Sequence, residues 1–151
     1  MAAFFAFLHH LAAFTLVGAV AVEFVLIRSE LSLASARRLQ ATDAVLGGAA
    51  VLVLVVGLLR VFVFEKGAAY YFHSVPFLVK LGVFIVLVLA SIPPTVEFLS
   101  WKKALKQGSV PAVAPAKLRA IRKIIHWELV GVVVILLCAA LMARGIGHLG
   151  S

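Results

Sequence analysis

The stretch Ala69-Ala-Tyr-Tyr-Phe-His-Ser-Val-Pro-Phe-Leu-Val-Lys80 continues directly into Leu81-Gly-Val-Phe-Ile-Val-Leu-Val-Leu89. His73 lies at the N-terminal edge of a long apolar segment, and Lys80 lies inside that segment. A lysine surrounded by Leu, Val, Ile and Phe is costly in a protein core and in a bilayer, so it needs a partner or a role. The stretch therefore predicts a membrane-spanning helix that carries a polar site.

The composition indicates a membrane protein with one domain, residues 1–151. Hydrophobic residues make up 64% of the chain and the mean hydropathy is +1.17, well above an ordinary soluble domain. Charged residues are only 13%, yet the net charge is +8. In a membrane protein such an excess marks cytoplasmic loops, so we expect a lipid bilayer as partner and no nucleic acid. The single cysteine, Cys138, excludes an intrachain disulfide.

Four apolar segments are long enough to cross a bilayer, which takes about 20 residues. All must be helical, because lipid offers no partner for backbone amides. Short connections make consecutive helices antiparallel neighbours, so we predict an all-α fold, an integral membrane up-down four-helix bundle. A separate amphipathic interfacial helix is predicted within 29–39, and Pro93-Pro94 predicts a kink or an end of the third helix. The spans are about 4–27, 43–64, 72–99 and 121–143.

Positive charge concentrates in two of the three connections. Residues 28–42 and 101–123 hold ten of the fourteen Lys and Arg residues. The positive-inside rule assigns both connections to the cytoplasm. We therefore predict periplasmic N- and C-termini, in a bacterial inner membrane that the chain crosses four times.

The ionisable residues within or beside the spans fall at two depths. At such positions they usually face the bundle interior and pair with another group. The outer level is basic and rich in imidazole, whereas the inner level is mostly acidic. We expect Glu23 and Glu128 to pair with nearby cations at the cytoplasmic surface, and a proton relay is the alternative. The outer level contains His9, His10, Arg60, His73, Lys80, Arg144 and His148; the inner level contains Glu23, Asp43, Glu97, His126 and Glu128; the nearby cations are Arg28, Arg122 and Lys123.

Helical phase selects the interior candidates on the first and third helices. His9 and Glu23 are fourteen residues apart and share one small, polar face, whereas His10 lies about 100° round the helix. A small helix rotation would exchange His9 and His10, so both remain candidates. His73 and Lys80 are seven residues apart, which predicts that they lie nearly one above the other on the third helix.

Histidines at similar depth on two bundle helices are the arrangement that a b-type haem needs. We expect His9 (or His10) and His73 to be the axial ligands of the haem iron. Arg60 and Lys80 would then pair with the propionates through charge-assisted hydrogen bonds. These five residues form the candidate site.

Other interpretations of the same residues remain open. The histidines could instead be interfacial residues bonded to backbone or lipid, and Arg144 is a further propionate partner. A copper site would draw on the soft ligands Met142 and Cys138 of the fourth helix. Lys80 could extend to the headgroups, or pair with Glu65.

Three runs of sequence carry a resemblance: Leu8-His-His-Leu-Ala-Ala-Phe-Thr-Leu-Val-Gly18, Leu59-Arg-Val-Phe-Val-Phe-Glu-Lys-Gly-Ala-Ala-Tyr-Tyr-Phe-His-Ser-Val-Pro-Phe-Leu-Val-Lys80 and Cys138-Ala-Ala-Leu-Met-Ala-Arg-Gly145. Together they resemble an uncharacterised bacterial family of small four-helix inner-membrane proteins. The likeness covers nearly the whole chain, and it implies a fold but no activity.

More remotely, the layout is similar to HemJ-type protoporphyrinogen oxidase and to the membrane part of the copper-resistance D proteins. The histidine, lysine and glutamate of HemJ-type proteins would correspond to His9 or His10, Lys80 and Glu128. This resemblance implies haem binding and porphyrinogen oxidation. The chain departs from the pattern at Leu78, where HemJ-type proteins have a histidine, and in the fourth helix it lacks the proline of their Asn-Glu-x-Pro motif.

These observations lead to three hypotheses about function. The first is a b-type haem-binding redox or porphyrin-handling protein. The second is a non-enzymatic scaffold or transporter component, in which Gly47, Ala50 and Gly57 build the face of a homo-oligomer. The third is copper handling. The chain contains no P-loop, nucleophile elbow or CxxC, so the sequence leaves open whether it is an enzyme.

Overall fold

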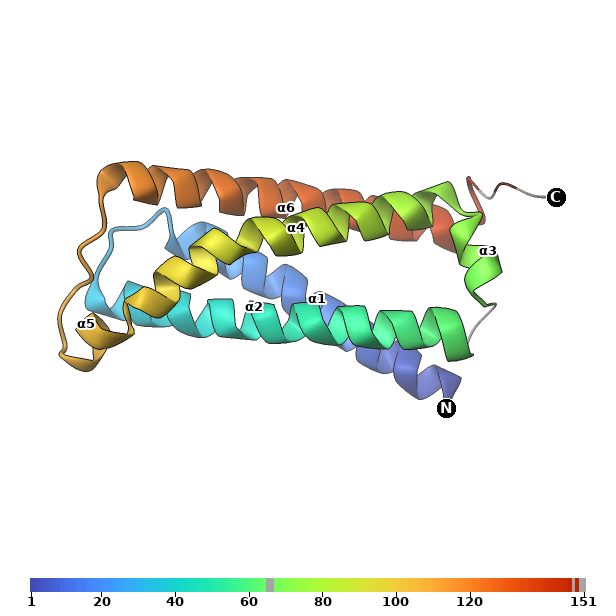
Figure 1. Ribbon diagram of the computed structural model, residues 1–151, viewed down its shortest axis with the longest axis horizontal. Helices are drawn as coiled ribbons and strands as arrows, with labels where there is room; N and C mark the ends of the chain where they lie inside the picture. Colours follow the sequence, from blue (N-terminus) through green and yellow to red (C-terminus); the bar gives the residue numbers. More distant parts are fainter. Residues whose placement is uncertain (65–66, 148, 150–151) are drawn as a thin grey trace.

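The structure is a computed structural model that describes residues 1–64, 67–147 and 149. Its four long helices run up and down in one bundle (Figure 1), and each is long and apolar enough to cross a membrane. This confirms the predicted all-α four-helix bundle. The elements are α1 (Ala2–Leu26), α2 (Leu33–Leu59), the π-helix η1 (Arg60–Phe64), α3 (Ala68–Phe72), α4 (Val75–Ser100), α5 (Lys102–Lys106) and α6 (Pro115–Ala143).

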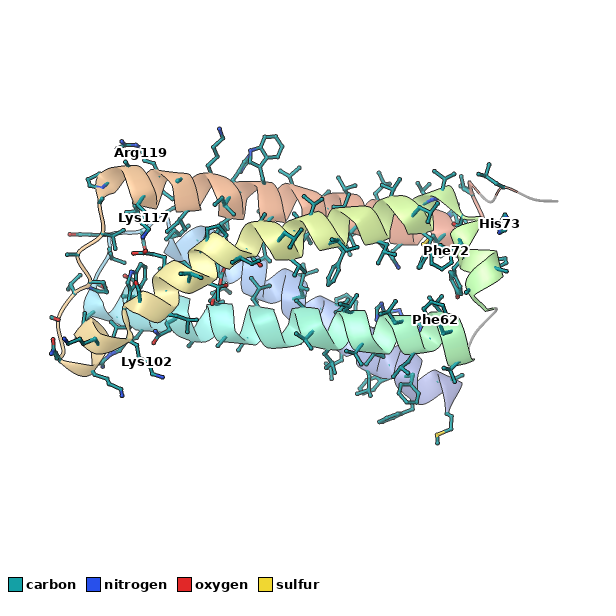
Figure 2. All side chains as sticks on the ribbon, viewed as in Figure 1. Phe62, Phe72, His73, Lys102, Lys117 and Arg119 are labelled. Atoms are coloured by element: carbon teal, nitrogen blue, oxygen red, sulfur yellow. The ribbon has the colours of Figure 1, made fainter. Side chains whose placement is uncertain are left out.

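The two ends of the bundle differ in content. Both chain termini lie at one end together with η1 and α3, and we call it the terminal end (Figure 1). The opposite end holds α5 and the connections 27–32 and 107–114, and we call it the basic end. Ten of the fourteen Lys and Arg residues belong to the segments 28–42 and 101–123 at or near the basic end. Lys102, Lys117 and Arg119 are labelled there in Figure 2.

The larger of two apolar core clusters fills the basic end. Leu39 of α2, Phe98 of α4 and Ile125 of α6 have no exposed surface there. Along the bundle, α1 packs chiefly on α2 and α4 packs chiefly on α6, and the two pairs separate toward the terminal end (Figure 1). The other buried members of this core are Ile27, Ala36, Trp101, Leu105 and Ile121.

Helix α2 is longer than the predicted second span. The separate interfacial helix predicted within 29–39 is wrong, because α2 starts at Leu33 and continues without a break. Ser32 begins the helix: its Oγ accepts a hydrogen bond from the Ser35 N–H (3.1 Å), and the Ser35 Oγ accepts one from the Ser32 N–H (2.8 Å). This reciprocal capping satisfies two amides that the first turn leaves unpaired. The amphipathic pattern reflects burial in the basic-end core, where Leu39 lies.

Helix α4 does not end at Pro93-Pro94, where a kink or an end was predicted. It continues through Pro93 and Pro94 to Ser100, and beyond the prolines it leans toward α2 (Figure 1). There the Gln40 side chain of α2 donates a hydrogen bond to the carbonyl of Phe98 (2.8 Å). The buried contacts with α2 hold this part of α4 inside the bundle, although each proline removes a backbone donor.

His73 does not belong to α4. The helix starts at Val75, and His73 is the C-terminal cap of α3. The predicted stripe of His73 and Lys80 on one helix is therefore wrong. The C-terminal segment holds this connection in place, because Val75 N–H donates to the carbonyl of Gly147 (3.0 Å) and Leu149 N–H donates to that of His73 (2.7 Å).

The outer faces of the four long helices are apolar. Large exposed side chains such as Phe14, Val86 and Leu137 lie on them. A surface of this kind is stable in hydrocarbon and would associate in water, so the structure agrees with a lipid bilayer setting. A homo-oligomer stays a prediction.

Candidate ligand cavity

A cavity of about 300 Å³ lies between the helix pairs at the terminal end. Most of its lining is apolar, and this volume falls at the lower end of the range for small-molecule sites. Phe14 and Leu136 line the cavity and are also exposed on the outside of the bundle. The cavity therefore opens toward the surface that faces lipid. Its polar lining residues are His9, His10, Arg60, Tyr71 and Lys80.

Four of the five predicted site residues thus meet at one cavity. His9 and His10 come from α1, Arg60 from the start of η1 and Lys80 from the second turn of α4. Of the two histidines, His10 is exposed, and its Nδ1 lies 2.7 Å from the carbonyl oxygen of Ala6. His9 is the more buried ring.

His73 is the predicted residue that the structure leaves outside. It is not among the residues that line the cavity. Its ring is exposed, and its Nδ1 lies 2.6 Å from the carbonyl oxygen of Ala69. Figure 2 shows it at the outermost part of the terminal end, beside Phe72. His9 and His73 are not brought together around a common space.

Helix α2 fixes the ring of His9. A Cβ atom at Gly57 would lie 3.0 Å from Cε1 of His9, so the absence of a side chain there allows the close approach. The buried Nδ1 of His9 has no hydrogen-bond partner among the residues that the structure describes. Gly57, which the sequence offered as part of an oligomer face, thus makes a close contact within the chain and positions this histidine.

Arg60 and Lys80 add positive charge to the cavity wall. Both lie near enough to His9 to interact with it electrostatically. Nζ of Lys80 is 5.9 Å from the ring centroid of Phe77, within the range of a cation–π contact. Arg60 begins a π-helical turn, a feature that is frequent at functional sites. Two cations on an apolar wall make this end of the cavity attractive to an anion.

A second polar group lies farther toward the basic end. Glu23 of α1, Asp43 of α2 and Glu128 of α6 are 1%, 6% and 4% exposed. Glu23 interacts electrostatically with both other carboxyl groups. The Thr95 hydroxyl donates a hydrogen bond to Oδ1 of Asp43 (2.7 Å). We call Glu23, Asp43 and Glu128 the carboxyl cluster.

The expected ion pairs of Glu23 and Glu128 are absent among the described residues, so this prediction is wrong. Arg122 instead donates its Nε–H to the carbonyl of Ile27 (2.8 Å). The guanidinium of Arg28 lies 3.9 Å from the ring centroid of Phe24. Arg122 and Arg28 thus bind a backbone carbonyl and a ring, and no described cation forms an ion pair with the carboxyl cluster.

Glu97 contrasts with the carboxyl cluster. It is buried near the same end, but it forms an ion pair with Lys117 and accepts a hydrogen bond from Nε1 of Trp101 (2.9 Å). A carboxylate with these two partners is satisfied within the fold.

Residues 1–147 match the family described as "Predicted membrane protein (DUF2214)". The chain belongs to this family. No curated protein and no solved structure matches the chain. DUF2214 membership agrees with a multi-pass membrane protein and names no activity. The remote resemblances to HemJ-type and copper-resistance D proteins stay predictions.

The remaining predicted ligands of this DUF2214 protein are dispersed. Met142 lines the cavity, whereas Cys138 is buried elsewhere on α6 and Arg144 is not a lining residue. Within residues 1–64, 67–147 and 149, no group of three or more His, Cys, Asp or Glu could hold a metal ion. His148 and Glu65 lie outside the described residues.

Proposed function

We propose that this DUF2214 protein binds an amphipathic anion from the bilayer in the cavity at the terminal end. The ligand has a largely apolar body and a carboxylate head group, and haem b or a related porphyrin is our leading candidate. The observation that carries the proposal is that His9, Arg60 and Lys80 line one mostly apolar cavity. The protein would then be a haem-binding redox or porphyrin-handling membrane protein.

Charge and burial support this class of ligand. Hydrogen bonds from Arg or Lys to a carboxylate are shorter and about twice as strong as neutral ones. They gain further strength where water is excluded, because the local dielectric constant is low. The apolar body would lie against side chains such as Phe77 and Phe84, and the opening at Phe14 provides a route from the lipid.

For haem, His9 is the residue best suited to bind the iron. Its ring lies close against Gly57 of α2 and its Nδ1 has no hydrogen-bond partner among the described residues, and a bound haem would supply one-electron redox chemistry. Arg60 and Lys80 would bind the propionates. The proposal uses one axial histidine from this chain, because His73 is exposed and lies outside the cavity lining.

The proposed setting is a bacterial inner membrane, with the basic end in the cytoplasm and both termini in the periplasm. The ten cations of segments 28–42 and 101–123 support this orientation through the positive-inside rule. Single-cysteine variants Ala2→Cys and Lys106→Cys, made in a Cys138→Ala background, test it in intact spheroplasts. An impermeant maleimide should label the first and spare the second, and the reverse pattern would overturn the orientation.

Haem binding is tested by titrating the purified protein with haemin in lipid nanodiscs and recording the Soret band. Wild type should shift and sharpen the band at one haem per chain. His9→Ala should abolish the shift, and the double variant Arg60→Gln/Lys80→Gln should weaken binding by more than tenfold, which is about 1.4 kcal/mol.

His73→Ala and Arg144→Gln are the matched controls, because both residues lie outside the cavity lining. Both should bind haemin as wild type does. Equal loss in His9→Ala and His73→Ala would instead support ligation by both histidines. If wild type binds neither haemin nor a porphyrin, the proposal fails and a non-enzymatic scaffold or transporter component is favoured.

A further inference from the structure

We infer that the carboxyl cluster is a proton-binding site that exchanges protons with the terminal-end cavity through the wall formed by Phe84 and Ile135. The inference does not depend on which ligand the cavity binds. It assigns a role to Glu23, Asp43 and Glu128, which the proposed ligand does not touch.

Two members of the cluster line a second cavity, which also reaches the exposed side chain of Val88. Asp43 and Glu128 line a space of about 60 Å³ together with Ser91 and Thr95. A cavity needs roughly 10–15 Å³ to hold one water molecule, so this space has room for several. A carboxyl group can accept hydrogen bonds from such waters and, when protonated, can donate to them, which is what proton transfer requires. The Ser91 and Thr95 hydroxyls can accept from waters, because they donate to the carbonyl of Val88 (2.8 Å) and to Oδ1 of Asp43 (2.7 Å).

Glu23 gives independent evidence that a hydrogen-bond acceptor in the cluster has no partner among the described residues. Its side chain is 1% exposed, yet Oε1 has no hydrogen-bond partner within the described part of the chain. A buried oxygen without a partner costs free energy unless something binds to it. A proton or a proton-donating water satisfies this atom.

The groups around the carboxyl cluster are carboxyls and hydroxyls, which favour binding of a proton there. Helix α1 contributes Glu23, α2 contributes Asp43 and α6 contributes Glu128, while α4 contributes the hydroxyls of Ser91 and Thr95. No Lys or Arg is among the described residues that line the space. Buried carboxyl groups in such settings serve as proton relays in pumps and transporters.

One wall separates this inner space from the terminal-end cavity. Phe84 of α4 and Ile135 of α6 line both. Toward the basic end, by contrast, lies the packed core that includes Ile27, Phe98 and Ile125. The thinnest barrier therefore lies toward His9, Arg60 and Lys80. The O–H bond of a carboxyl group breaks and leaves a carboxylate, the proton bonds to a water of the inner space, and that water passes a proton through the wall to a water of the terminal-end cavity.

The test is attenuated-total-reflection infrared spectroscopy of the protein in lipid, with bulk pH steps and H₂O-to-D₂O exchange. Wild type should show carboxyl C=O bands that respond to pH, and Asp43→Asn and Glu128→Gln should each remove part of this signal. Phe84→Ala should make the carboxyl bands exchange with D₂O several-fold faster. Ile135→Ala is the second wall variant, in case Phe84→Ala does not fold.

Two controls are matched to these variants. Phe62→Ala removes an exposed phenylalanine outside both cavity linings and should leave the exchange rate unchanged. Glu97→Gln removes the paired carboxylate and should leave the pH-dependent bands of the cluster unchanged. If no band is lost in the cluster variants, or if neither wall variant changes the exchange rate, the inference is overturned.

Discussion

The two ends of the bundle use the same four helices in opposite ways. At the basic end the helices enclose a core in which Leu39, Phe98 and Ile125 have no exposed surface. At the terminal end the helix pairs separate around a cavity whose wall carries Arg60 and Lys80. The basic end is closely packed, whereas the terminal end is less closely packed and contains a cavity with two cations on its wall.

The difference suggests a division of roles: packing at the basic end stabilises the fold, and the terminal end carries the proposed ligand site. Helices α1, α2 with its extension η1, and α4 supply the histidines and the two cations of the cavity and also continue into a packed region, so these groups are held by anchored helices. His9 and Glu23 illustrate this on α1, since fourteen residues at 1.5 Å per residue place them about 21 Å apart along the axis. The terminal end can therefore bind a ligand without weakening the basic end.

The largest expected effect tests the packed end. Phe98→Ala should lower the free energy of unfolding by about 3–5 kcal/mol, because it leaves a void in a core that cannot fully collapse. Phe7→Ala is the control, since Phe7 is 61% exposed on the lipid-facing side and its loss should change stability little. Denaturant titration in detergent micelles measures both. Equal losses would contradict the division between the two ends.

A smaller effect is expected where the two regions meet. A Cβ atom at Gly131 of α6 would lie 2.7 Å from Cδ2 of Leu87 on α4. Gly131→Ala should therefore destabilise the protein by about 1–3 kcal/mol through overpacking. Gly18→Ala meets no heavy atom within 4 Å and should be neutral or slightly stabilising. The melting temperatures of the two variants make the comparison, and a Gly131→Ala protein as stable as wild type would show that α4 and α6 are loosely packed there.

The smallest effect on stability is expected at the terminal end. Gly57→Ala places a Cβ atom 3.0 Å from Cε1 of His9, so the ring must shift while the helix gains in propensity. We expect a change in stability within about 1 kcal/mol and a several-fold loss of haemin affinity. Gly48→Ala, which meets no heavy atom within 4 Å, should leave affinity unchanged. A large loss of stability with unchanged haemin affinity would contradict the conclusion that Gly57 positions the His9 ring for binding.

Much of the candidate site was predictable because it depends on helical phase and depth. His9, Arg60 and Lys80 were expected near one end of the bundle, and they line one cavity there. The predicted stripe of His73 and Lys80 was wrong, because the helix breaks at Ser74 and a phase argument does not hold across a break. Ser74 and Pro76 are the signal that could have located this break, because serine is a preferred N-cap residue and proline is common in the first turn of a helix.

The inner carboxyl groups show the same limit. Their depth was predictable from the spans, but their partners were not. Arg28 and Arg122 are close in sequence to Glu23 and Glu128, yet they bind the Phe24 ring and the Ile27 carbonyl. Long cationic side chains can reach several acceptors, and only the packed structure selects among them.

The sequence by itself determined the membrane setting, the four helices and their up-down order, because burial of backbone amides in lipid allows little else. It also determined which ionisable residues lie at each depth. Only the tertiary structure decided that the helix pairs separate at one end, that Gly57 seats His9 and that Phe84 and Ile135 divide two cavities. These features depend on how helices tilt and approach one another, which the shapes of side chains far apart in the sequence decide.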